Sequence, residues 1–120
     1  MSQPLLSIIV PYYNTSEELI RPLLESIHTQ VGINFEEIEV IICDDASTDF
    51  KLTPKFLKYF KKLNITVLHA KENGGPGVAR QMGINACKAP YFTCCDADDI
   101  FYTCTSLFEL MSAIKNAEER

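Results

Sequence analysis

Residues 38–49 read IEVIICDDASTD, and this stretch decides the fold. Its first six residues, apolar except for Glu39, form a short run of the kind that makes a β-strand covered on both faces. Two aspartates and a Ser-Thr-Asp sequence follow at once. Open parallel sheets bind ligands at the carboxyl ends of their strands, so polar residues in this place favour a binding site.

Similar apolar runs occur on both sides of this stretch, and each is bounded by turn residues. They alternate with helical patterns, which indicates βαβ units and a mainly parallel sheet. The predicted strands are 5–10, 38–43, 65–69 and 91–95. We therefore predict a three-layer α/β/α fold and a single domain over residues 1–120.

Amphipathic helices are predicted in the gaps between the strands. In the first, Thr15 is the candidate cap with Glu18 three residues on, and Pro22 predicts a kink or a restart near Arg21. The second is predicted at 54–63 and the third at 77–87, with a narrow face of Ala79, Met82, Gly83 and Ala86. The last begins with Ser106 and Glu109 as a capping box and carries an apolar stripe of Leu107, Leu110, Met111 and Ile114.

Charge and composition restrict the partners. The formal net charge is −5, which argues against nucleic acid, because nucleic-acid binding depends on an excess of lysine and arginine. Lys51, Lys55, Lys58 and Lys62 recur at helical spacing and are interpreted as a solvated face. No segment approaches the ~20 apolar residues of a membrane span. These features favour a cytoplasmic setting, or the cytoplasmic face of a membrane in a longer protein.

The five cysteines contain no Cys-x-x-Cys pair, and their odd number does not close into a complete set of disulfides. We expect most of them to be reduced core residues. Only two histidines accompany them, which disfavours a zinc site.

Three other predicted strands also end in polar residues. The first is followed by PYYN at 11–14, the third by ENGGPG at 72–77 and the fourth by DADD at 96–99. Asp96, Asp98 and Asp99 repel one another unless a cation, water or ligand groups neutralise them. Such a cluster suits Mg²⁺ or Mn²⁺, which prefer carboxylate oxygens and keep positions open for phosphate. Taken alone, residues 44–49 could equally be a turn with a helix cap, and the glycines only a tight turn.

The glycine segment supplies what a phosphate ligand needs. Gly74, Gly75 and Gly77 let the backbone approach closely, the following helix points its amides at the site, and Arg80 adds a fixed charge. Tyr12 or Tyr13 offers an aromatic surface for a base. The carboxylate of Asp45 could accept hydrogen bonds from base N–H groups.

The ordered set PYYN, CDDASTD, NGGPGVARQMG and DADD resembles family 2 glycosyltransferases of the GT-A fold, over about residues 6–105. The resemblance implies a Rossmann-like domain that binds a nucleotide-diphospho-sugar, UDP-linked by expectation, for inverting transfer to an acceptor such as a glycan or a lipid-linked saccharide. It also implies residue roles, in which Tyr13 lies against uracil, Asp45 contacts the base and Arg80 lies near the nucleotide. Asp96 contacts the ribose and, with Asp98, holds Mn²⁺ or Mg²⁺. Pro11 and Gly75 complete the predicted nucleotide-sugar site.

Two residues depart from the family pattern: Gln81 stands where many members have asparagine, and Ala46 where many have glycine. In the family a later segment carries the acceptor site and the general base, and it has no counterpart here after Glu119. We therefore expect the catalytic base to be absent and transfer by this chain to be weak. We also expect copies to pair through an exposed sheet edge and through the apolar stripe of the last helix, left exposed.

Two alternatives come from other classes of protein. One is a non-catalytic module that binds a nucleotide-sugar. The other is a phospho-accepting receiver domain, but receivers place their acidic pair after the first strand and a lysine after the last.

Overall fold

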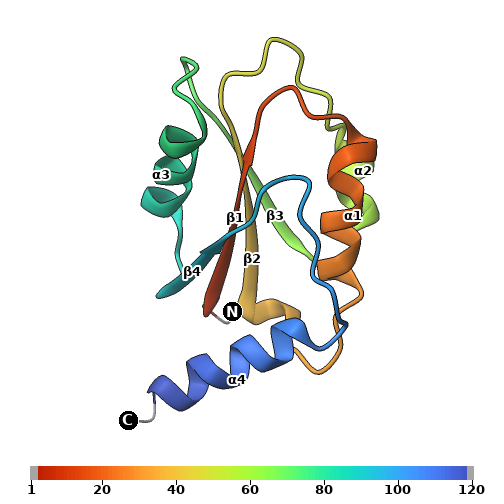
Figure 1. Cartoon of the computed structure of the whole chain (residues 1–120), viewed down its shortest axis with the longest axis vertical. Coiled ribbons are helices and arrows are strands. Elements are labelled where there is room, and N and C mark those ends of the chain that lie inside the picture. The colour runs from red at the N-terminus through yellow and green to blue at the C-terminus, as the bar shows by residue number, and fades with distance from the viewer. Residues whose placement is uncertain (1–2, 119–120) are drawn as a thin grey trace.

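The computed structural model describes residues 3–118, so the predicted domain limits at 1–2 and 119–120 lie outside the described residues. Strands and helices alternate along the chain, as predicted (Figure 1). The elements are β1 (Leu6–Tyr12), α1 (Glu17–His28), the 3₁₀ turn η1 (Phe35–Glu37), β2 (Ile38–Asp44), α2 (Pro54–Tyr59), β3 (Asn64–His69), α3 (Pro76–Ala86), β4 (Tyr91–Cys94) and α4 (Ser106–Glu118).

The four strands form one sheet in the order β3-β2-β1-β4, and every neighbouring pair is parallel. The two central strands, β1 and β2, are the most buried. Tyr12 pairs with Asp44, and Asp44 with His69, so three strands end at the same level. The polar segments that follow them therefore begin at one edge of the sheet.

Helices cover both faces of the sheet, which confirms the three-layer fold (Figure 1). Side chains of a strand point alternately to opposite faces. Ile8 and Val10 accordingly enter the larger core with α1, α2 and α4. Ile9 and Cys43 enter a smaller core on the other face, beneath α3.

Helix α3 packs closely on the sheet because its inner face is narrow. A Cβ atom added at Gly83 would lie 2.6 Å from Cys43 Sγ and 2.6 Å from Ile9 Cγ2. Ala79 and Gly83 are buried, as the predicted narrow face requires. Ala86 is exposed, so that part of the prediction is wrong.

The predicted helix starts need correction at both ends of the chain. Ser16 caps α1, and its Oγ accepts a hydrogen bond from Leu19 N at 3.2 Å, so the predicted cap at Thr15 is wrong. The helix continues through Pro22 without a restart, because only one backbone donor is lost there and Pro22 is solvent-exposed. In α4, Ser106 is already helical and its Oγ accepts from Thr103 N at 3.4 Å, so the predicted capping box does not form.

The apolar stripe of α4 is covered in the folded chain. Leu107, Met111 and Ile114 are buried in the larger core, and Leu110 packs against it. Gln30, which follows α1, fixes the start of this helix: its Oε1 accepts from Leu107 N at 2.9 Å and its Nε2 donates to Thr103 O at 2.7 Å. The expectation that this stripe would be exposed for self-association is therefore wrong. Pairing of copies through a sheet edge stays a prediction.

The cysteines do not all lie in the core. All five are free, but only Cys43 is buried, whereas Cys94 and Cys104 are exposed, which corrects the expectation of mostly buried thiols. Desolvation by burial raises the pKa of Cys43 to about 11 and that of Cys95 to about 11. Both thiols therefore stay protonated at neutral pH.

No helix within residues 3–118 combines the length and the apolar character that crossing a membrane requires.

Candidate functional site

A pocket of about 460 Å³ opens at the carboxyl edge of the sheet, within the size range of small-molecule sites. Residues that follow β1, β2, β3 and β4 all contribute to its wall. Five of the predicted binding residues line it together: Pro11, Tyr13, Asp45, Gly75 and Asp96. Segments that are far apart in the sequence thus converge on one site, as their position after parallel strands predicted.

Asp45 holds the glycine segment in place. The residue is 3% exposed, and its two carboxylate oxygens accept hydrogen bonds from Gly74 N and Gly75 N, each at 2.8 Å. Asn73 Nδ2 adds a bond of 3.2 Å to the carbonyl oxygen of Asp45. The carboxylate therefore acts as an acceptor for a loop of the protein, and this contact was not predicted.

Asp44 connects the ends of three strands through a network of hydrogen bonds. One of its carboxylate oxygens accepts from Ser47 N at 3.0 Å and Ser47 Oγ at 2.5 Å, and the other lies 2.6 Å from His69 Nδ1. Ser47 Oγ in turn accepts from Asn14 N at 2.8 Å. This network fixes the backbone on either side of the pocket residues Tyr13 and Asp45. The two adjacent aspartates therefore have different roles. Asp44 stabilises the loop that follows β2, and Asp45 lines the pocket.

The two adjacent tyrosines have different environments. Tyr12 is 2% exposed; its hydroxyl donates to Thr15 O at 2.6 Å and accepts from Lys51 N at 3.1 Å. Desolvation by burial raises the pKa of Tyr12. Tyr13 is 47% exposed and lines the pocket. Of the two candidates, only Tyr13 presents an aromatic ring that is free to contact a ligand.

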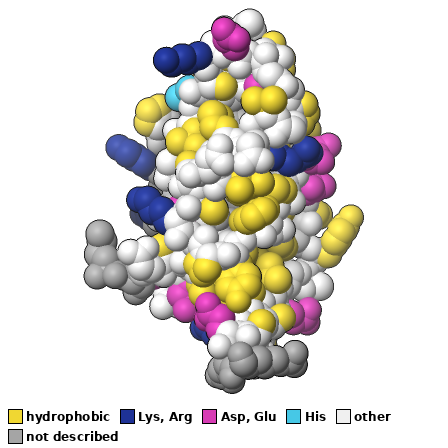
Figure 2. All heavy atoms as spheres, turned by 90° about the vertical axis from the view of Figure 1, so that its left-hand side faces the viewer, with side chains coloured by type: hydrophobic (Ala, Val, Ile, Leu, Met, Phe, Trp, Pro, Cys, Tyr) yellow, Lys and Arg dark blue, Asp and Glu magenta, His cyan; other side chains and the backbone are white. Residues whose placement is uncertain are grey.

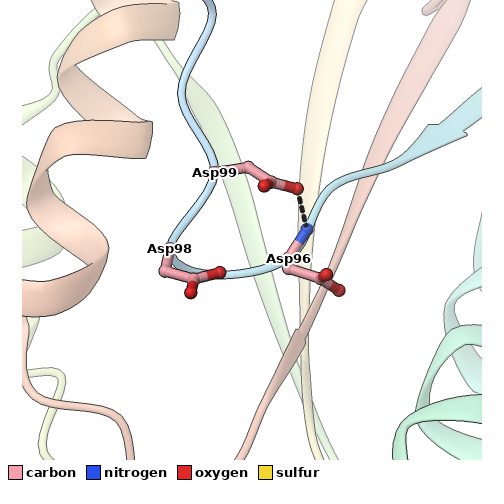
Figure 3. Close-up of side chains that lie close together, drawn as sticks. All are labelled: Asp96, Asp98 and Asp99. Atoms are coloured by element: carbon pink, nitrogen blue, oxygen red, sulfur yellow. Dashed lines mark hydrogen bonds between the residues drawn. The ribbon is translucent and has the colours of Figure 1, made fainter.

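The predicted acidic cluster forms a tight turn after β4 (Figure 3). Asp99 N donates to Asp96 O at 2.9 Å, and the carboxylate of Asp99 accepts from Asp96 N at 2.8 Å. One ligand atom from each of Asp96, Asp98 and Asp99 lies within 4.8 Å of the others. All three residues are exposed, which leaves their oxygens accessible. Carboxylate oxygens at this spacing have the chemistry and the room to hold a divalent cation.

Arg80 and Asp98 border the pocket rather than line it. Arg80 Nη2 on α3 lies 3.2 Å from Asp96 Oδ1, and both side chains are partly exposed. Through this ion pair Arg80 connects α3 to the acidic turn. Asp98 stands beyond Asp96 in that turn and belongs to the site through the acidic cluster.

Sequence reasoning missed several residues of the pocket wall. They carry no charge, so only their neighbours in the motifs could have indicated them. These residues are Thr15, Asn73, Pro76, Ala79 and Ala97.

Backbone strain at Ala46 leads to a first prediction. Its φ of +59° lies in the left-handed region, which costs an L-residue roughly 1 kcal/mol and glycine almost nothing. We expect Ala46→Gly to raise the free energy of unfolding by up to about 0.5 kcal/mol, since glycine's greater unfolded-state entropy offsets part of the relief. Urea denaturation measures the change. A loss of stability would show that the strain is not released in this way.

The comparisons with known proteins agree with this geometry. The profile of the family "Glycosyl transferase family 2" matches residues 7–118. The chain is 37% identical over 98 residues to glycosyltransferase GlyG of Streptococcus pneumoniae, covering 80% of this chain and 31% of GlyG. It is 41% identical over 96 residues to a teichoic acid poly(glycerol phosphate) polymerase of Staphylococcus epidermidis, covering 78% of this chain and 13% of the polymerase.

Solved structures show the same likeness in three dimensions. S. aureus TarS 1-349 in complex with UDP-GlcNAc superposes with a TM-score of 0.78 at 32% identity, over 93% of this chain and 31% of TarS 1-349. Mannosyltransferase PcManGT from Pyrobaculum calidifontis, in complex with GDP-Man and Mn²⁺, superposes with a TM-score of 0.72 at 26% identity, over 88% of this chain and 31% of that chain.

The chain spans less than a third of the length of each of these four proteins. The family match nevertheless covers most of this chain, and the sheet agrees with the GT-A fold of the solved relatives. The chain therefore belongs to glycosyl transferase family 2.

Proposed function

We propose that this chain binds the nucleotide-diphospho-sugar donor of an inverting glycosyl transfer, with UDP as the nucleotide. The observation that carries the proposal is the pocket between the glycine segment held by Asp45 and the turn that carries Asp96. A polar, backbone-rich wall on one side and carboxylates on the other suit a ligand with a base at one end and a diphosphate at the other. Family membership also excludes the receiver-domain alternative.

The pocket suggests a role for each predicted residue. The exposed ring of Tyr13 stacks on the base, with Pro11 beside it. Gly75 begins the wall that leads to the amino end of α3, where backbone N–H groups favour an anion. Asp45 keeps a second lone pair on each oxygen for a base N–H. Relatives solved with UDP-GlcNAc and GDP-Man support a nucleotide-sugar ligand.

Asp98 and Asp96 are proposed to hold Mn²⁺ or Mg²⁺. Asp98 is the first choice because no hydrogen bond or ion pair engages its side chain within residues 3–118, whereas Asp96 pairs with Arg80. A divalent ion supplies positive charge that stabilises a leaving diphosphate. The Mn²⁺ in the complex of PcManGT supports such an ion here.

Activation of the acceptor is a separate task, and we assign it to no residue between 3 and 118. The two carboxylates in the pocket wall are already engaged: Asp45 by glycine amides and Asp96 by Arg80. Transfer to an acceptor such as a glycan or a lipid-linked saccharide is therefore proposed for a protein that supplies a further base. Lacking a base costs about 10²–10⁴-fold in rate, so we expect weak transfer by this chain alone.

Metal-dependent binding of UDP provides the test. We expect UDP to bind at least about tenfold more tightly with Mn²⁺ than with a chelator, and Asp98→Asn to remove most of this difference, because a carboxylate ligand is lost. Isothermal titration calorimetry measures both affinities. Glu72→Gln, which removes an equal charge from another exposed residue, is the control and should keep the metal dependence.

Equal affinity for UDP with Mn²⁺ and with chelator would contradict the metal site. No binding under either condition would contradict the donor site itself. Release of UDP from UDP-sugars, with and without candidate acceptors, then separates a transferase from a module that only binds the donor.

A further inference from the structure

Charge is distributed very unevenly along this acidic chain. Residues 50–71 hold six of its eleven lysines and arginines and none of its sixteen aspartates and glutamates. The remaining residues carry five basic and sixteen acidic side chains. The basic segment forms α2 and the edge strand β3, whereas the acidic turn follows β4 at the other edge of the sheet. Seen from the α3 side, Lys and Arg lie chiefly along the left margin, whereas Asp and Glu lie at the top, along the right margin and at the lower end (Figure 2).

Helix α2 has two different sides. Phe56 and Phe60 are buried in the larger core and hold the helix to the domain. Lys55, Lys58 and Tyr59 are exposed, and Tyr59 retains 59% of its surface. We call Lys55, Lys58, Tyr59, Lys61 and Lys62 the α2 surface. It joins cationic side chains to an exposed aromatic ring, which contacts the core residue Phe60 with a distance of 5.2 Å between the ring centroids.

Two shallow depressions flank α2, and the residues that line them indicate which kind of partner the α2 surface can bind. The first, of about 240 Å³, is lined by the acidic Glu17, the basic Arg21 and Lys55, and by Thr53, Phe56 and Tyr59. One carboxylate oxygen of Glu17 accepts hydrogen bonds from Thr53 N and Thr53 Oγ1, both at 3.0 Å, so this depression carries one negative charge beside two positive ones.

The second depression, of about 360 Å³, has an apolar floor and a cationic rim. Its floor is formed by Leu57, Phe60, Leu63 and Ile65, and its rim by Lys58 and Lys61. No acidic residue lines it.

We propose that the α2 surface docks on a bilayer that contains anionic lipids. A cluster of lysines is attracted to the negative potential of such a bilayer, and amphipathic rings and lysine stems rest at the level of the headgroups. The partly exposed Leu57, Leu63 and Ile65 favour a lipid over a soluble polyanion, because a phosphate polymer would leave this apolar floor unused. No residue of the α2 surface lines the 460 Å³ pocket, so docking leaves the donor site free.

Co-sedimentation with vesicles tests the proposal. We expect the chain to bind vesicles of phosphatidylcholine that contain about one-third phosphatidylglycerol, and not vesicles of phosphatidylcholine alone, with affinity falling as salt rises. Each lysine near an anionic surface contributes up to about fivefold in affinity, so Lys55→Gln with Lys58→Gln should weaken binding by about tenfold or more. The control pair, Lys88→Gln with Lys115→Gln, removes the same charge elsewhere and should change binding less than threefold, which is below one lysine's contribution.

Tyr59→Ser separates the aromatic contribution from the charge. It should lower affinity for the anionic vesicles severalfold and leave the salt dependence unchanged, whereas the double lysine variant should also make the salt dependence less steep. Urea denaturation, which does not depend on UDP binding, checks that each variant is folded.

Equal binding to both kinds of vesicle, no binding to either, or equal losses from the two lysine pairs would overturn the proposal. Binding to soluble polyphosphate without binding to anionic vesicles would also overturn it, in favour of a polyanion.

Discussion

Asp45→Ala is expected to weaken UDP binding by at least about tenfold and to lower the free energy of unfolding by about 2 kcal/mol. The variant leaves the amides of Gly74 and Gly75 without the charged acceptor that each contacts at 2.8 Å, and hydrogen bonds to charged groups contribute about 1.5–3 kcal/mol. Because water can hydrogen-bond the two amides once the loop opens, part of the lost free energy of unfolding is recovered. Calorimetry with UDP and urea denaturation measure the two effects.

Asp45→Asn distinguishes this role from a simple effect of charge. An asparagine presents one acceptor and one NH₂ donor, so one of the two glycine amides then faces another donor. We expect Asn at this position to bind UDP nearly as poorly as Ala. Asp49→Asn, which removes the same charge from an exposed residue after the same strand, is the control and should keep wild-type affinity. If Asp45→Asn binds UDP normally, the carboxylate does not hold the glycine segment as described.

Gly83→Ala is expected to destabilise the chain by about 2 kcal/mol. The new Cβ would lie 2.6 Å from both Cys43 Sγ and Ile9 Cγ2, and neither atom can move easily, because Ile9 is β-branched and both residues sit in buried strands. Overpacking of this kind costs about 1–3 kcal/mol, and two such contacts place the cost near the upper end. The higher helix propensity of alanine offsets up to about 1 kcal/mol of this cost. Urea or thermal denaturation gives the net value.

Gly77→Ala provides the matched control within the same helix. A Cβ at Gly77 would meet nothing within 4 Å, and its φ is not in the left-handed region, so we expect this variant to be as stable as the wild type or slightly more so. A Gly83→Ala variant with unchanged stability would show that α3 can move away from the sheet at little cost.

Much of the fold could be predicted because its signals are local. The four strands and their parallel arrangement followed from apolar runs with polar ends, and the structure places each strand within two residues of its predicted limits. Helix ends were harder to predict, because several residues compete for a cap. Thr15 and Ser16 have the same chemistry, and only the backbone decides that Ser16 takes the role.

The site was predicted as a set of residues but not as a set of contacts. Polar residues after parallel strands had to meet, and Asp45, Gly75 and Asp96 do meet at one pocket. Neither the bonds from Asp45 to Gly74 and Gly75 nor the ion pair of Arg80 with Asp96 could be derived, because they join segments 16 to 30 residues apart. Both neighbouring tyrosines line the pocket, and only their burial in the structure shows that Tyr13 is the one with an exposed ring.

The strand order β3-β2-β1-β4 also has a consequence for how the chain folds. β1, β2 and β3 can pair in the order in which they are made, but the other side of β1 has to wait for a partner that begins at Tyr91. Contacts between residues so far apart in the sequence form late. The chain loses conformational entropy when the intervening loop closes, and the contacts contribute favourable free energy only after that. Asp96 lies beyond that last strand. The pocket is therefore assembled only after the chain has been synthesised beyond Asp96, so a shorter nascent chain has no complete pocket.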